Sequence, residues 1–185
     1  MRPISSAPAA IREGELGEAP SFAAVFRTHA PYVWRLLRRL GAAHADADDL
    51  CQEVFVVVHR RLPELDTARS LRPWIYGVAV RVASEHRRRQ RVCDELNEQD
   101  DAPTPPAQHD AMEWRRLRGL LDEAILRLEE PKRAIFVLHE LEELNMAEIA
   151  EAVSCPLQTA YSRLHAARKE VKAFFARLDA KETQR

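Results

Sequence analysis

Residues 145–169 read NMAEIAEAVSCPLQTAYSRLHAARK, and their spacing decides the fold of the C-terminal part of the chain. Asn145 followed by Glu148 is the sequence form of a capping box, which starts a helix. That helix is short and is expected to end near Val153. Pro156 then suits the first position of a second helix. A short helix, a tight turn and a second helix together predict a helix-turn-helix.

The second helix of this motif is expected to present hydrogen-bonding side chains to solvent. Arginine can pair bidentately with guanine and glutamine with adenine, while cations further along the helix suit phosphates. An amphipathic surface helix with a solvated basic face is the alternative. The candidate DNA-contacting residues are Gln158, Thr159, Tyr161, Ser162, Arg163, His165, Arg168 and Lys169.

The remainder of the last helix should bury an apolar stripe. Apolar residues recur along it at helical spacing, and a preceding helix is predicted to start at Pro131. Small residues at Ala150 and Ala160 fit a close crossing of the two helices of the motif. The residues expected to face inward are Leu157, Leu164, Val171 and Phe174 or Phe175.

The N-terminal half also has a helical period. Apolar residues repeat at three- and four-residue spacing from Phe22 to Leu40, and Pro31 is expected to break that helix or start a new one. Gly41 is predicted to close it. No stretch has a convincing strand pattern, since the run VFVVV at residues 54–58 lies within a helical period. We therefore predict an all-α fold.

Two further helices are expected before residue 91. One opens at Asp46, whose side chain can accept the free amides of the first turn, and ends at Pro63. The next begins near Pro73 and runs into the basic sequence HRRRQR at residues 86–91.

Charge divides the chain into segments. The 185 residues are 46% apolar and 31% charged, which is a globular composition, and the formal net charge is −1. Residues 91–113, however, carry one basic and seven acidic side chains and few large apolar ones, so they cannot build a core. The expected organisation is a disordered tail (1–20), a helical domain (21–90), a flexible acidic linker (91–113), a domain with the helix-turn-helix (114–179) and a tail (180–185).

Several function classes lack their signatures. No apolar run approaches the roughly 18 residues that span a bilayer, and no secretory signal is present, so a cytoplasmic protein is expected. Three scattered cysteines form neither a disulfide framework nor a zinc motif. Neither GxGxxG nor a P-loop occurs. We predict no catalytic residues, no metal and no cofactor.

Two side-chain clusters leave alternatives open. Asp46, Asp49 and Glu53 share a helix face, where they could bind a divalent metal in a helical hydrolase or present a surface to a protein partner. Trp74 and Tyr76 precede the basic helix end, where they could stack on the bases of opened nucleic acid or pack in the core.

The combination resembles the small sigma factors of the extracytoplasmic-function group, in the sigma-70 family, over roughly residues 22–175. Residues 47–55, ADDLCQEVF, look like the A-E-D-L-x-Q-E-x-F signature of region two, and residues 74–79, WIYGVA, are similar to its W-L-Y-x-I-A segment. The region four pattern appears in Leu128, Pro131, Arg133, Leu138, residues 147–150, Thr159, residues 162–164, Ala167 and Arg168. Ser154 stands where the family has a turn glycine, which predicts strain if the residue needs a positive φ.

This resemblance implies a non-enzymatic promoter-recognition subunit. Its partners would be core RNA polymerase, promoter DNA and an anti-sigma factor, commonly anchored in the inner membrane. The implied polymerase-binding residues are Asp48, Asp49, Leu50, Gln52, Glu53 and Phe55. The implied minus-10 contacts are Arg69, Arg72, Trp74, Tyr76, Arg81, His86, Arg88 and Arg89, and the helix-turn-helix would read the minus-35 element. A stand-alone helix-turn-helix regulator is the main alternative.

Overall fold

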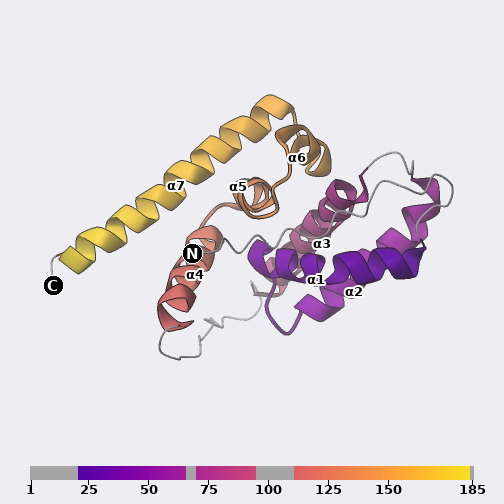
Figure 1. Cartoon of the computed structure of the whole chain (residues 1–185), viewed down its shortest axis with the longest axis horizontal. Helices are drawn as coiled ribbons and strands as arrows, with labels where there is room; N and C mark the ends of the chain where they lie inside the picture. The colour runs from indigo at the N-terminus through magenta and orange to yellow at the C-terminus, as the bar shows by residue number, and fades with distance from the viewer. Residues whose placement is uncertain (1–20, 66–69, 95–110, 184–185) are drawn as a thin grey trace, which may run out of the picture.

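The computed structural model describes residues 21–65, 70–94 and 111–183. The predicted N-terminal tail and most of the predicted linker lie outside these residues. Every regular element within them is helical, as predicted (Figure 1). The elements are α1 (Phe22–Leu40), α2 (Ala47–Arg61), the 3₁₀ turn η1 (Leu62–Glu64), α3 (Leu71–Asp94), α4 (Ala111–Leu126), α5 (Glu130–Phe136), the π-helical η2 (Val137–Leu141), α6 (Met146–Ala152) and α7 (Leu157–Thr183).

Helix α1 continues through Pro31, so the predicted break there is wrong. Proline removes one backbone hydrogen bond from a helix interior. Val25 and Val33, on either side of it, are both buried in one core with α2 and α3, and this packing offsets the loss. The predicted stop at Gly41 is confirmed: its φ is 104°, a value that suits glycine.

The predicted side-chain cap of α2 is also wrong. Asp46 occupies the N-cap position, but its carboxylate accepts no amide of the first turn. Its Oδ2 instead lies 3.1 Å from Nε2 of His86 and accepts a hydrogen bond from Nε2 of Gln90 at 3.2 Å. The carboxylate thus joins the start of α2 to the basic end of α3.

The helix-turn-helix forms as predicted. The side chain of Asn145 accepts the amides of Ala147 and Glu148 at 3.0 Å, and the Glu148 carboxylate accepts the Asn145 amide at 3.0 Å. Ser154 in the turn has a φ of 52°. Ala150 and Ala160 are buried where α6 crosses α7.

Leu157 does not face inward as predicted, since it is 46% exposed. The buried stripe of α7 starts one turn later, at Ala160, and continues through Leu164 and Phe174. Periodicity identified the apolar face but not the point where neighbouring helices begin to cover it. At the other end, α7 reaches Thr183, beyond the predicted domain boundary at residue 179.

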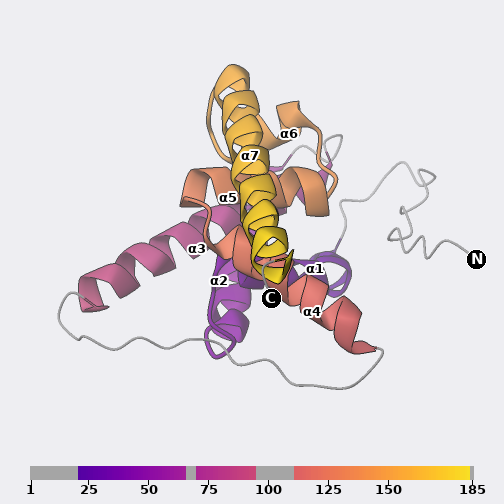
Figure 2. The same ribbon diagram turned by 90° about the vertical axis from the view of Figure 1, so that its left-hand side faces the viewer.

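The helices form two groups that pack against each other. Helices α1, α2 and α3 form one group, and α4 to α7 the other, with α6 beside α3 and α4 and α5 beside α1 (Figures 1 and 2). One continuous apolar core runs through both groups. None of the described helices is both long enough and apolar enough to cross a bilayer.

Arg133 of α5 links the carboxyl-terminal ends of α1 and α4. Its buried guanidinium donates to the carbonyl of Leu40 at 3.0 Å, of Ile125 at 3.1 Å and of Leu128 at 2.8 Å. Buried charge is tolerated when it is fully hydrogen-bonded, and helix carboxyl ends favour cations. A Cβ on Gly41 would lie 2.8 Å from Nη1 of Arg133, so a larger residue here would displace this guanidinium and would also be strained at a φ of 104°.

Candidate nucleic-acid and protein interfaces

Helix α2 presents a polar face beside a buried stripe. The predicted polymerase-contacting residues divide between these two sides: Asp48, Gln52 and Glu53 are exposed, as is Asp49, whereas Leu50 is only 2% exposed and Phe55 3%. The two apolar residues therefore hold the helix in place, and the four polar ones are accessible to a partner.

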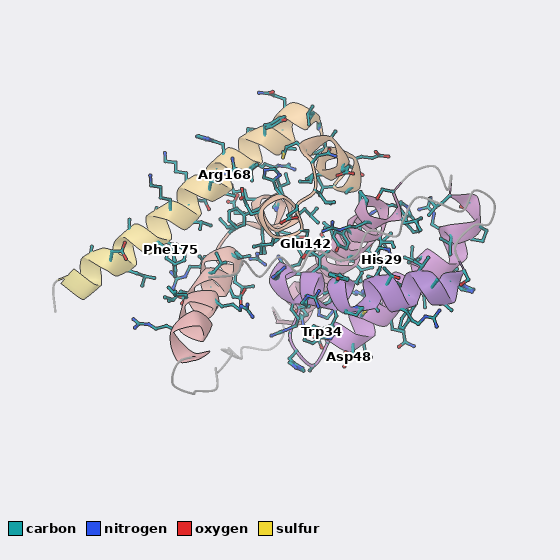
Figure 3. The ribbon with its side chains drawn as sticks, in the orientation of Figure 1. His29, Trp34, Asp48, Glu142, Arg168 and Phe175 are labelled. Carbon is teal, nitrogen blue, oxygen red and sulfur yellow. The ribbon has the colours of Figure 1, made fainter. Side chains whose placement is uncertain are left out.

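An open apolar groove of about 750 Å³ lies between α1 and α2, next to that polar face. Phe26 and Val56 on its walls are each 43% exposed, so together they form a contiguous apolar surface rather than isolated exposed side chains. Trp34 of α1 donates from Nε1 to Oδ1 of Asp48 at 2.8 Å and fixes the edge of the groove (Figure 3). Sequence reasoning missed Trp34, although aromatic residues at 22, 26 and 34 follow one face of α1.

The N-terminal half of α3 faces the second group of helices. Tyr76 is 1% exposed and donates its hydroxyl to Oε2 of Glu142 at 3.0 Å. Burial, followed by the charge of Glu142, raises the pKa of Tyr76 to about 12, so the hydroxyl keeps its proton. Trp74 is half-buried, and Arg81, which is exposed, donates to the carbonyl of Gly77 at 3.3 Å. Arg69 lies outside the described residues.

The C-terminal half of α3 is accessible and basic. Arg88 is exposed, and Arg89 forms an exposed ion pair with Glu53 of α2 at 3.3 Å. His86 is half-buried against Asp46. Asp46 and Glu53, two members of the candidate metal cluster, are thus engaged by α3 side chains. Across the described residues, no group of three His, Cys, Asp or Glu side chains is placed to hold a metal ion.

The face of α7 predicted to read DNA is mostly open to solvent. Tyr161 is 51% exposed, and the Ser162 hydroxyl donates to the carbonyl of Gln158 at 3.0 Å. Nη2 of Arg168, which is labelled in Figure 3, lies 2.6 Å from Oε1 of Glu140 in η2. The exposed members of the predicted set are Gln158, Tyr161, Ser162, His165, Arg168 and Lys169, and the half-buried ones are Thr159 and Arg163.

Glu142, which sequence reasoning missed, lies between the two groups of helices (Figure 3). It is 5% exposed and follows directly after η2. Its Oε1 accepts a hydrogen bond from Arg39 of α1 at 2.9 Å, and its Oε2 lies 3.7 Å from Nη2 of Arg72 of α3. Nothing in the local pattern ELEELN distinguishes this glutamate from its exposed neighbour Glu143.

Comparison with known proteins matches both groups of helices to known families. Residues 25–92 match the family Sigma-70 region 2, and residues 118–171 match Sigma-70, region 4. The first range overlaps residues 21–90, and the second lies within residues 114–179.

Relatives matched over most of this chain give the same result. The ECF RNA polymerase sigma factor SigE of Mycolicibacterium smegmatis is 30% identical over 92% of this chain and 68% of its own length. The ECF RNA polymerase sigma factor SigW of Bacillus subtilis is 24% identical over 88% of this chain and 92% of its own length. Among solved structures, the sigma factor RpoE of Bartonella quintana, crystallised with the anti-sigma factor NepR, superposes with a TM-score of 0.69 at 18% identity, covering 84% of this chain and 96% of that one.

Proposed function

Because the chain belongs to the sigma-70 family, as an extracytoplasmic-function RNA polymerase sigma factor for promoter recognition, we propose that its interfaces divide that task among α2, α3 and α7. Helix α2 and the adjoining groove bind core RNA polymerase, α3 binds the minus-10 element, and α7 reads the minus-35 element. The chain contributes no catalytic step of its own.

The observation that carries this proposal is the capped helix-turn-helix with an exposed, polar recognition helix. Amide, hydroxyl and cationic side chains at the start of α7 are the groups that read base edges in a major groove. A stand-alone regulator would also have such a motif. It would not need the region 2 sequence that residues 25–92 carry, and this disfavours the alternative.

The polymerase-binding surface is supported by the chemistry of α2. Exposed carboxylates and an amide next to an apolar groove provide both the charged rim and the desolvated centre of a protein interface. Polymerase and DNA lie in the bacterial cytoplasm, and we propose that the chain acts there.

An anti-sigma factor is the second proposed partner. The groove between α1 and α2 could accept apolar side chains of such a protein and so withhold the surface from polymerase. Solved relatives with the same fold include a sigma factor bound to an anti-sigma factor, which supports this class of partner. Whether that partner is anchored in a membrane stays a prediction from the resemblance.

Run-off transcription from a genomic promoter library tests the proposal. Core polymerase with this chain should start transcripts at new sites, and core alone should not. Substituting Asp49 and Gln52 with Ala should reduce initiation at every promoter equally, since polymerase binding is lost. Absence of new start sites with the wild-type chain would contradict the proposed function.

A further inference from the structure

The start of α7 exposes two large apolar side chains on one face. Leu157, the first residue of the helix, is 46% exposed, and Tyr161, four residues later, is 51% exposed. Residues at this spacing are neighbours on a helix surface, so the two side chains form one apolar ridge. The described helices leave much of this ridge open to solvent. Adjacent exposed apolar side chains indicate an interaction surface, whereas single ones need no explanation.

The surroundings of the ridge indicate that its partner is a nucleic acid. Residues 157–169 contain no Asp or Glu and carry three basic side chains, at Arg163, Arg168 and Lys169. Glu140, which pairs with Arg168, lies beyond the ridge by about two helical turns. A basic segment of this kind suits the phosphates of a duplex, and it places the ridge where the start of a recognition helix meets base edges.

The chemistry of the ridge selects one feature of the bases. Leucine has no hydrogen-bonding group, and the apolar group that a base edge presents in the major groove is the C5-methyl of thymine. Gln158, exposed beside Leu157, has the amide that pairs bidentately with adenine. Four residues of a helix rise about 6 Å, and successive bases lie about 3.4 Å apart, so the ridge spans about two base pairs.

We propose that Leu157 and Tyr161 read thymine methyl groups in the minus-35 element, next to an adenine contact by Gln158. This inference rests on the proposed function, which assigns α7 to that element. It adds that the base pairs facing the start of α7 are A·T pairs, and that Leu157 determines specificity although it cannot donate or accept a hydrogen bond.

Exchanging thymine for uracil tests this contact, because it removes the methyl group and keeps every hydrogen-bonding group of the base. The probe is a fluorescein-labelled promoter duplex with the minus-35 element of the strongest promoter found by run-off transcription. Each thymine of the element is replaced in turn, and binding of core polymerase carrying the full-length chain is measured at one fixed salt concentration. With the wild-type chain we expect a loss of about fourfold at two positions, which is the effect of one buried methyl group.

Variants of the ridge assign these losses to side chains. In Leu157→Ala and Tyr161→Ala, binding to the thymine duplex should weaken, and the effect of uracil should shrink to below about twofold, at a different one of the two positions in each variant. Leu117→Ala is the matched control: this leucine of α4 is 47% exposed, and its removal should keep both uracil effects. Circular dichroism checks that each variant keeps its helices.

Three results would overturn the inference: a minus-35 element without thymine, wild-type binding that is indifferent to uracil at every position, or uracil effects of wild-type size in both ridge variants. The last two are also expected if the ridge binds a protein instead of DNA. Each would leave the proposed function standing, provided that the polymerase complex still starts transcripts at this promoter. If it starts none at any promoter, the proposed function fails, and this inference fails with it.

Discussion

The two proposed DNA-binding faces of this protein differ in how accessible they are. On α3, Tyr76 is 1% exposed and Arg72 is paired with Glu142, whereas on α7 Tyr161 is 51% exposed and Gln158 is open to solvent. Both faces carry aromatic and polar side chains suited to DNA. The difference arises from what packs on them: α6 covers this face of α3, whereas the face of α7 that carries Gln158 and Tyr161 is left uncovered by the described helices. On the proposed assignment, contact with the minus-35 element needs no rearrangement, and contact with the minus-10 element does.

Removing Arg133, which lies where α5 meets the end of α1, should lower the stability of the protein more than any other change considered. Arg133→Ala leaves the carbonyls at the end of α4 without this buried donor, while the carbonyl of Leu40 keeps the hydrogen bond from Arg87. We expect the free energy of unfolding to fall by about 3 kcal/mol in urea titrations. Arg127→Ala is the matched control: it breaks an exposed pair with Glu123 and the contact of the guanidinium with the Phe174 ring, and the loss should stay at about 1 kcal/mol. Equal losses in the two variants would contradict the role of Arg133.

DNA binding by the exposed face of α7 can be weakened separately. Arg163→Ala should reduce binding of a minus-35 duplex by about 1–3 kcal/mol if the guanidinium contacts a base, with relaxed preference at one position. Lys172→Ala, further along α7, should weaken binding evenly across sequences. Both effects, measured by fluorescence anisotropy, are expected to be the same in the Gly77→Ala background, which inserts a methyl group between α3 and α6, because the α7 face is open in either protein. If either effect differed between the Gly77→Ala and the wild-type backgrounds, the DNA-binding faces of α3 and α7 would be coupled.

Alkaline pH should lower the free energy of unfolding through Tyr76, on the face of α3 that packs against the second group of helices. The pKa of this residue is raised from 10.0 to about 12, so above pH 10 the folded protein keeps a proton that the unfolded chain releases. Stability therefore falls as pH rises, by about 2 kcal/mol between pH 9 and 11.5. Tyr76→Phe should lack this part of the decline when the free energy of unfolding is measured across that range. An identical pH dependence in both proteins would argue against a buried, protonated hydroxyl.

The smallest expected effect concerns the turn that positions the exposed face. Ser154 adopts a φ of 52°, where glycine has no steric cost. Ser154→Gly should raise the melting temperature, with a gain of up to about 1 kcal/mol, and leave DNA affinity unchanged. Reduced stability would mean that the side chain contributes an interaction that outweighs the strain.

Features determined by neighbours in sequence were predictable. The capping box of Asn145 and Glu148 and the glycine stop at Gly41 depend on residues three or four positions apart, and both were found. The positive φ at Ser154 follows from the turn that the motif requires.

Features determined by distant partners were not predictable. Pro31 remains inside α1 because of packing on α2 and α3, and Asp46 binds His86, 40 positions away, instead of its own helix. Glu142 meets Arg39 across 103 positions. A single sequence with local periodicity contains no signal for such pairs, and for that reason the contact between the two domains was missed.

Distance measurement between the two domains tests the central claim most directly. Fluorescent dyes on cysteines introduced at the exposed positions Glu64 and Ala147, with the three native cysteines replaced, would report the separation of η1 from α6. The closed structure predicts high energy transfer in the free chain and a marked loss once core polymerase and promoter DNA are bound. The same transfer efficiency in the free and the bound chain would contradict it.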